Sequence, residues 1–153
     1  MILTLLMAHM LISVVLIGAV SHQAFSLWRP TAASGRNIVT NFRAVRGSVY
    51  TNAIAILYVL TTIGGAIVYP AYVLDAKKPL TDMSLNLAIG AFEVKEHFAI
   101  IGLAIIPAYV AYWRKAADDQ DLFTRKVLTV MVAGFVWWNF MVGHILTDLR
   151  GIF

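Results

Sequence analysis

The feature that most constrains the fold is a set of four apolar stretches, which cover residues 2–27, 49–74, 85–113 and 122–147. Each is long enough for a membrane-spanning helix, which needs ~20 predominantly apolar residues. Backbone amides in lipid must be hydrogen-bonded by the protein itself, and a helix satisfies them within one segment. The sequence therefore predicts an all-α fold, a four-helix transmembrane bundle that forms a single integral membrane domain.

Composition supports this class and narrows the chemistry. Of the 153 residues, 60% are hydrophobic and 13% are charged, whereas a soluble domain carries ~25% charged residues. The chain has no cysteine, which excludes disulfides, thiolate catalysis, cysteine-ligated zinc and iron–sulfur clusters. A bound metal or haem would have to be held by His, Met, Tyr or carboxylate side chains.

The basic residues predict the orientation. Eight of the 12 lysines and arginines lie on one side of the apolar stretches, in segments 28–48 and 114–126. Cytoplasmic loops carry the excess of Lys and Arg, so we expect a bacterial inner membrane with both termini on the periplasmic side. The first basic residue is Arg29, so the first stretch lacks the positive region of a signal peptide and is expected to remain as a helix. Membrane lipid is the expected partner, and nucleic acid is not.

A short amphipathic helix is predicted over residues 35–46, between the first two apolar stretches. Ile38, Phe42 and Val45 recur at helical spacing, and Ser34 and Gly47 are suitable start and stop residues. Such a helix would lie on the cytoplasmic membrane surface. A solvated basic loop is an equally good interpretation.

Small residues in the second stretch predict close helix packing. The segment "TTIGGA" places Thr61, Gly64 and Gly65 where a neighbouring backbone can approach. In lipid, where burial gives helices no hydrophobic driving force, such residues are enriched at helix interfaces.

All four histidines fall within the apolar stretches. Ionisable residues are rare there and usually face the bundle interior or a cavity. At ~1.5 Å of rise per residue, His9, His97 and His144 lie at similar depths in the outer half, on three different helices, whereas His22 lies alone in the cytoplasmic half. We therefore expect His9, His97 and His144 to converge on a site for a metal or cofactor.

The segment "FEVKEHFAIIG" contributes carboxylates to this expected site. Glu93 and His97 are one turn apart and share a helix face, and Glu96 borders it, while Lys95 projects to the opposite side. We expect Glu93 and Glu96 to be the catalytic, proton-handling residues. The alternative is that they mark the headgroup level of the membrane, with Lys95 as their partner.

An aromatic face accompanies His144. Trp137, Phe140 and Met141 lie on its side of the fourth stretch and would form a flat apolar wall, with Trp137 as a cofactor-binding residue. Plain helix packing is the alternative role of these side chains.

Three kinds of chemistry fit these residues. Two imidazoles from facing helices can bind a haem iron axially, with apolar side chains around the macrocycle. His and Glu together can hold a non-haem transition metal. A chain of Glu and His side chains can also relay protons across part of the membrane.

Four apolar stretches, no cysteine and histidines on separate helices together resemble the small b-type cytochromes of bacterial membranes, such as cytochrome b561-like proteins and haem-binding quinol oxidoreductase subunits. The resemblance implies a membrane oxidoreductase in which haem b passes electrons between quinone or quinol and a partner. Two-haem members need four ligands in two pairs, and His22 lacks a partner at its depth, so at most one bis-histidine haem is implied here. Two alternatives remain open, namely a membrane enzyme with a His/Glu metal site and a small accessory subunit of a larger membrane complex or homo-oligomer.

The haem hypothesis predicts that the purified protein is coloured. The optical spectrum should show a Soret band and an α-band that changes on reduction, because an axially ligated b haem absorbs in both oxidation states. A colourless protein with neither band contradicts haem binding. Elemental analysis that finds stoichiometric zinc, copper or iron without porphyrin would favour the metal-enzyme alternative.

Overall fold

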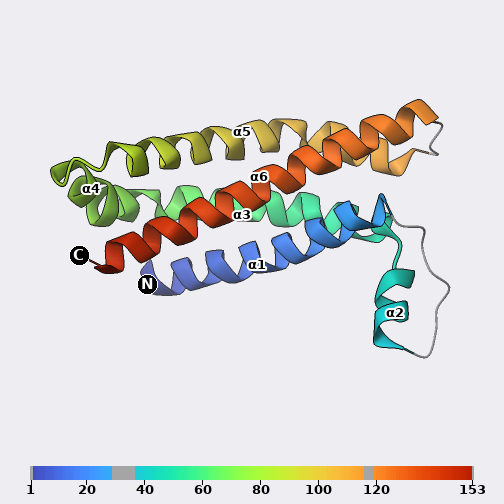
Figure 1. Cartoon of the computed structure of the whole chain (residues 1–153), viewed down its shortest axis with the longest axis horizontal. Coiled ribbons are helices and arrows are strands. Elements are labelled where there is room, and N and C mark those ends of the chain that lie inside the picture. The colour runs from blue at the N-terminus through green and yellow to red at the C-terminus, as the bar shows by residue number, and fades with distance from the viewer. Residues whose placement is uncertain (1, 29–36, 116–118, 153) are drawn as a thin grey trace.

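The computed structural model describes residues 2–28, 37–115 and 119–152, and within these ranges the chain is helical with no strand. The predicted all-α class is confirmed. Four helices are long: α1 (Ile2–Ser26), α3 (Thr51–Tyr72), α5 (Asn86–Arg114) and α6 (Asp119–Ile152). They run side by side, with α1 packed on α3 and α6, and α5 packed on the same two helices (Figure 1).

Short elements lie at the two ends of the long helices. Helix α2 (Ile38–Ala44) occupies part of the predicted 35–46 helix, and the 3-10 turn η1 (Gly47–Tyr50) leads from it into α3. The π-helical turn η2 (Val73–Lys77) and helix α4 (Lys78–Asp82) follow α3 at the opposite end, where α1 begins and α6 ends (Figure 1).

The second apolar stretch is longer than predicted. Helical structure continues from Gly47 to Asp82 without a break, whereas the sequence suggested an end near residue 74. The π-helical turn absorbs the change of register that follows Pro70, whose ring nitrogen cannot donate a helix hydrogen bond. The turn into α5 is made at Ser84, which has a φ of 58°, a left-handed value that ends helix α4 sharply.

Two apolar clusters form the core. The first joins all four long helices through Leu16, Val20, Ile54, Tyr58, Ile106, Tyr109, Val132 and Val136. The second lies at the end near α4 and consists of Leu80, Phe92, Val142 and Leu146. Around Phe92, the Tyr72 ring stacks at 3.7 Å between centroids, so aromatic packing joins α3 to α5 in the second cluster.

Most of the other large apolar side chains point outward. Exposed fractions reach 70% at Leu3, 59% at Ile56, 64% at Ile100 and 46% at Val130, one on each long helix. Three of the described helical stretches are long and apolar enough to cross a membrane, namely Ile2–Ser26, Gly47–Asp82 and Asp121–Leu146. Helix α5, predicted as a further span, is not among the three.

Buried hydrogen bonds join the helices at the end near η1. Gln23 is fully buried, and its amide nitrogen donates to the Gly47 carbonyl at 3.1 Å and to the Thr51 hydroxyl at 3.3 Å. The Tyr109 hydroxyl donates to the Gln23 side-chain oxygen. One amide therefore holds α1, η1, α3 and α5 together, and its polar atoms are satisfied although it lies among apolar side chains.

Close contact between α3 and α5 depends on Gly102. The Tyr58 hydroxyl donates to the carbonyl of Ala99 at 3.2 Å, and a Cβ at Gly102 would overlap this hydroxyl. Only glycine leaves room for the phenol here.

Replacing Gly102 by alanine is therefore expected to lower the free energy of unfolding by about 1–3 kcal/mol, the usual effect of overpacking. The matched control is Gly134→Ala on α6, where no atom lies within 4 Å of the added carbon. It should leave stability unchanged or raise it by up to ~1 kcal/mol through helix propensity. Thermal unfolding followed by circular dichroism compares the two variants, and equal melting temperatures would contradict the Tyr58–Gly102 contact.

Candidate polar site between the helices

Lys95 points toward the interior of the four helices. It lies on the same face of α5 as the buried residues Phe92, Gly102 and Ile106. Its ammonium group lies 4.6 Å from the centre of the Phe92 ring. Its Cε lies 3.6 Å from the position that a Cβ on Gly143 of α6 would occupy. The lysine side chain therefore reaches from α5 to α6, and a cation–π contact partly compensates its charge.

His9 of α1 packs into a gap that two glycines leave on α3. A Cβ at Gly64 would lie 3.0 Å from Nδ1 of His9, and one at Gly65 would lie 3.5 Å from Cε1. The ring lies beside the backbone of Thr61, and the charge of Lys95 acts on it. Close packing at the small residues of the second stretch is thus confirmed, and its partner is a histidine.

His9 and Thr61, together with Lys95 at the edge of the second cluster, form a polar layer between the helices. On α3, Thr61 lies between Tyr58 of the first cluster and Tyr69, which packs on the second. The Nδ1 of His9 and the hydroxyl of Thr61 are buried, and neither has a hydrogen-bond partner among the described residues. Since buried polar groups are normally hydrogen-bonded, this layer can still bind a polar atom.

The remaining polar residues of "FEVKEHFAIIG" lie away from this layer or at its edge. Glu93 is exposed and forms an ion pair with Lys77 at 3.4 Å. His97 is exposed, and its Nδ1 lies 2.6 Å from the carbonyl oxygen of Glu93, one turn earlier in the same helix. Glu96 is half-buried, and its charge acts on Lys95. Glu93 and His97 share a face as expected, but this face is the outer one.

On α6, His144 and Trp137 are both exposed. The ring of His144 stacks on that of Phe140, with 6.0 Å between centroids and 9° between planes, so these two residues share a side of the helix as expected. The indole nitrogen of Trp137 donates to the Ser21 hydroxyl at 2.9 Å. Trp137 therefore joins α6 to α1.

The expected convergence of the three histidines is not found. His9 faces α3 in the interior, whereas His97 and His144 lie on exposed faces of α5 and α6. In the described parts of the chain, no three His, Asp or Glu side chains form a group that could hold a metal ion. A haem needs only two axial histidines, so this result does not test haem ligation, which stays a prediction.

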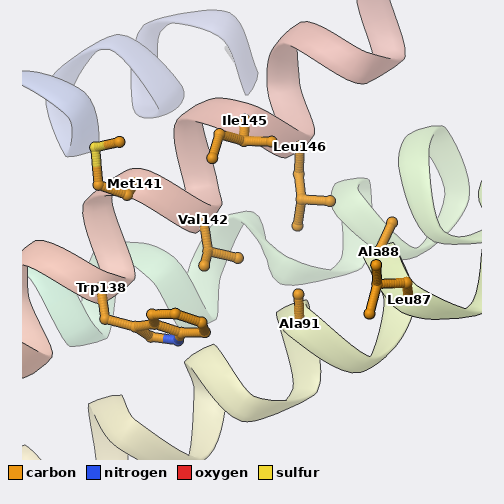
Figure 2. Close-up of a pocket in the computed structure, with 8 residues that line it drawn as sticks. All are labelled: Leu87, Ala88, Ala91, Trp138, Met141, Val142, Ile145 and Leu146. Atoms are coloured by element: carbon orange, nitrogen blue, oxygen red, sulfur yellow. The ribbon is translucent and has the colours of Figure 1, made fainter.

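An apolar groove lies between α5 and α6, with a volume of about 330 Å³. Figure 2 shows the side chains that form it, which come from two turns of α5 and three of α6: Leu87, Ala88, Ala91, Trp138, Met141, Val142, Ile145 and Leu146. The lining contains no histidine, so the groove offers a haem no axial ligand from its own walls.

The sequence placed Lys95 on the side of α5 opposite Glu93 and His97, and this is confirmed. That side is the inner one, so Lys95 enters the interior in place of Glu93 and His97. The role of His9 as a ligand stays a prediction. A signal was available, because Lys95 is three residues after Phe92 and seven before Gly102, and so lies on the side of the helix where a small residue permits close packing.

Comparison with models of known protein families, with curated proteins and with solved structures finds no match.

Engineered cysteines can test the position of His9. A Cβ at Gly64 would lie 3.7 Å from the Cβ of His9, within the ~3.5–4.5 Å that a disulfide requires. The natural chain has no cysteine, so the double variant His9→Cys/Gly64→Cys adds one defined pair. It should oxidise to an intramolecular disulfide that changes its mobility on a non-reducing gel.

The control pair is His9→Cys with Gly90→Cys on α5, where nothing lies within 4 Å of the added carbon. This pair should stay reduced under the same conditions. Equal oxidation of both pairs, or oxidation of the control alone, would contradict the packing of His9 on Gly64.

Proposed function

We propose that the chain is an integral membrane protein, a four-helix transmembrane bundle, which handles protons at the polar layer of His9, Thr61 and Lys95. The observation that carries this proposal is the inverted distribution of side chains. Large apolar residues cover the outside of the helices, whereas the side chains of His9 and Lys95 point between them.

The exposed apolar surface supports insertion into lipid. A soluble monomer rarely exposes a continuous apolar patch of more than a few hundred Å². Here exposed Leu, Ile, Val, Phe and Met side chains follow the length of all four long helices. Lipid removes the cost of exposing them, and the helices satisfy their own backbone hydrogen bonds.

Helix α5 is proposed as the fourth span in spite of its charges. Its residues 98–113 carry no charged side chain, and Ile100 and Ile101 are exposed on its surface. The charges gather near its beginning, where Glu93 pairs with Lys77 and would lie close to the outer membrane surface. Lys95 turns inward, which keeps its charge away from lipid.

The distribution of basic residues supports an orientation. Helix α2 and the basic segments around it would lie in the cytoplasm, and α4 with both termini would lie on the periplasmic side of a bacterial inner membrane. The polar layer would then lie in the outer half of the membrane, below the Lys77–Glu93 ion pair.

Proton handling is the chemistry that these groups support best. The charge of Lys95 acts on His9, and that of Glu96 acts on Lys95. The charge of Glu96 also acts on the phenol of Tyr72, which lies closer to the outer end. The proposed relay runs through titratable groups of α1, α3 and α5, from His9 and Lys95 in the interior to Tyr72 near the outer end.

Electron transfer between quinone and a partner through haem b remains an alternative proposal. A haem held by His9 together with His97 or His144 would have to bridge the interior and an outer face of the helices. The optical spectrum described above decides whether a haem is present, independently of proton movement.

A liposome experiment tests the proposed function. Purified protein is reconstituted into liposomes that contain a pH-sensitive dye, and a membrane potential is imposed. The wild-type chain should acidify or alkalinise the interior faster than protein-free liposomes do. Lys95→Met keeps the apolar part of the side chain but removes the titratable group, so it should abolish the added flux.

Lys78→Met is the matched control, because Lys78 is exposed on α4. It should conduct protons like the wild type. A wild-type flux equal to that of protein-free liposomes would overturn proton conduction, and equal flux in wild type and Lys95→Met would exclude Lys95 from the path.

A further inference from the structure

Lys95 lies one helical turn from the apolar groove between α5 and α6. Ala91 lines the groove, and Lys95 follows it by one helical turn on the same face of α5. On α6, the groove residue Val142 directly precedes Gly143, against which the Lys95 side chain lies. The ammonium group turns back toward Phe92, the neighbour of Ala91. Lys95 is therefore not part of the groove wall, but it follows the groove residues by one turn on α5 and contacts the residue next to Val142 on α6.

Among the described residues, no carboxylate forms an ion pair with Lys95. It forms no ion pair or hydrogen bond with a described residue, and its close contact is the face of the Phe92 ring. The neighbouring Glu96 interacts with the Lys95 charge but forms no ion pair with it. A lysine in an apolar interior is stable as a cation only when an anion or several hydrogen bonds compensate its charge.

We propose that Lys95 and the groove form a binding site for a lipid-soluble carboxylic acid. Its carboxylate would meet the Lys95 ammonium, and its hydrocarbon chain would lie along the groove toward Leu87. This inference rests on the proposed function to the extent that the groove must face lipid. It adds a ligand class that proton handling alone does not require.

Size and lining fit such a ligand. The groove volume of about 330 Å³ falls at the lower end of the ~300–1,000 Å³ typical of small-molecule sites. All eight lining residues are apolar, and small side chains at Ala88 and Ala91 leave space between the two helices (Figure 2). An apolar groove with one ammonium group a helical turn beyond it matches an amphiphile with one acidic headgroup.

Trp138 gives a direct measure of occupancy. Its indole lines the groove (Figure 2), and its ring also packs edge-on against Phe98 of α5. Bromine on a bound hydrocarbon chain quenches a tryptophan that it contacts. Titration of the protein in lipid nanodiscs with 9,10-dibromostearic acid should therefore quench Trp138 fluorescence in a saturable manner.

Two comparisons assign the quenching to the proposed site. The methyl ester of the same acid partitions into lipid but carries no charge, so it should bind about tenfold more weakly or worse. Lys95→Met should weaken binding of the acid by a similar factor, whereas the surface control Lys78→Met should bind it like the wild type. Trp138→Phe should remove the saturable part of the signal.

A second variant tests the groove without changing Lys95. Ala91→Phe places a ring in the groove and should block binding of the acid, while circular dichroism shows that the helices remain folded. Equal quenching by the acid and its ester, or equal affinity in wild type and Lys95→Met, would overturn the proposal.

The binding experiment and the proton-flux experiment can fail independently of each other. Binding is measured in nanodiscs without a proton gradient, so a chain that moves no protons but binds the acid at Lys95 supports the ligand site alone. A chain that conducts protons through Lys95 but does not distinguish acid from ester supports the relay and contradicts the site.

Discussion

The packing of the four long helices depends on where these helices, whose outer surfaces are apolar, place their polar side chains. The long helices expose large aliphatic residues along their outer faces. In the proposed membrane setting, a charged side chain within the span is more stable in the interior, where other side chains can compensate its charge. Lys95 follows this rule, since its stem lies against Gly143 and its ammonium against Phe92. His9 follows it through the gap at Gly64 and Gly65.

The two ends of the helices hold this polar layer in place by different means. At the end near η1, the buried amide of Gln23 bonds to Gly47, Thr51 and Tyr109, and so fixes the relative positions of α1, α3 and α5. At the end near α4, stacking of Tyr72 on Phe92 joins α3 to α5. The layer lies between these rigid parts, which explains how unpaired polar atoms can persist there at a cost in stability.

Much of the fold follows from the sequence, because the length of an apolar stretch and the period of a helix are both visible in it. The all-helical class and the contact surface at Gly64 and Gly65 follow in this way. The extension through η2 and α4 does not, since Lys77, Lys78 and Pro79 suggest a loop, and only the π-helical turn after Pro70 reconciles them with a continuous helix.

The site was harder to predict for a physical reason. Four polar residues within five positions of α5, from Glu93 to His97, point in nearly all directions around the helix, so the rule that polar residues face inward cannot choose among them. Contacts with other helices, together with the Phe92 ring on α5, decide which of these side chains faces inward. Gly143 and Phe92 accept the lysine, while Lys77 holds Glu93 outside.

Spin-label accessibility in lipid bilayers tests the central claim most directly. Single cysteines at Leu11, Ile56, Ile100 and Val130 place one nitroxide on an exposed apolar position of each long helix. If these faces meet lipid, all four labels collide often with dissolved oxygen and seldom with a water-soluble nickel complex. The opposite ratio at any of them, and above all at Ile100 on α5, would contradict a bundle that turns its apolar side chains to lipid and encloses its charges.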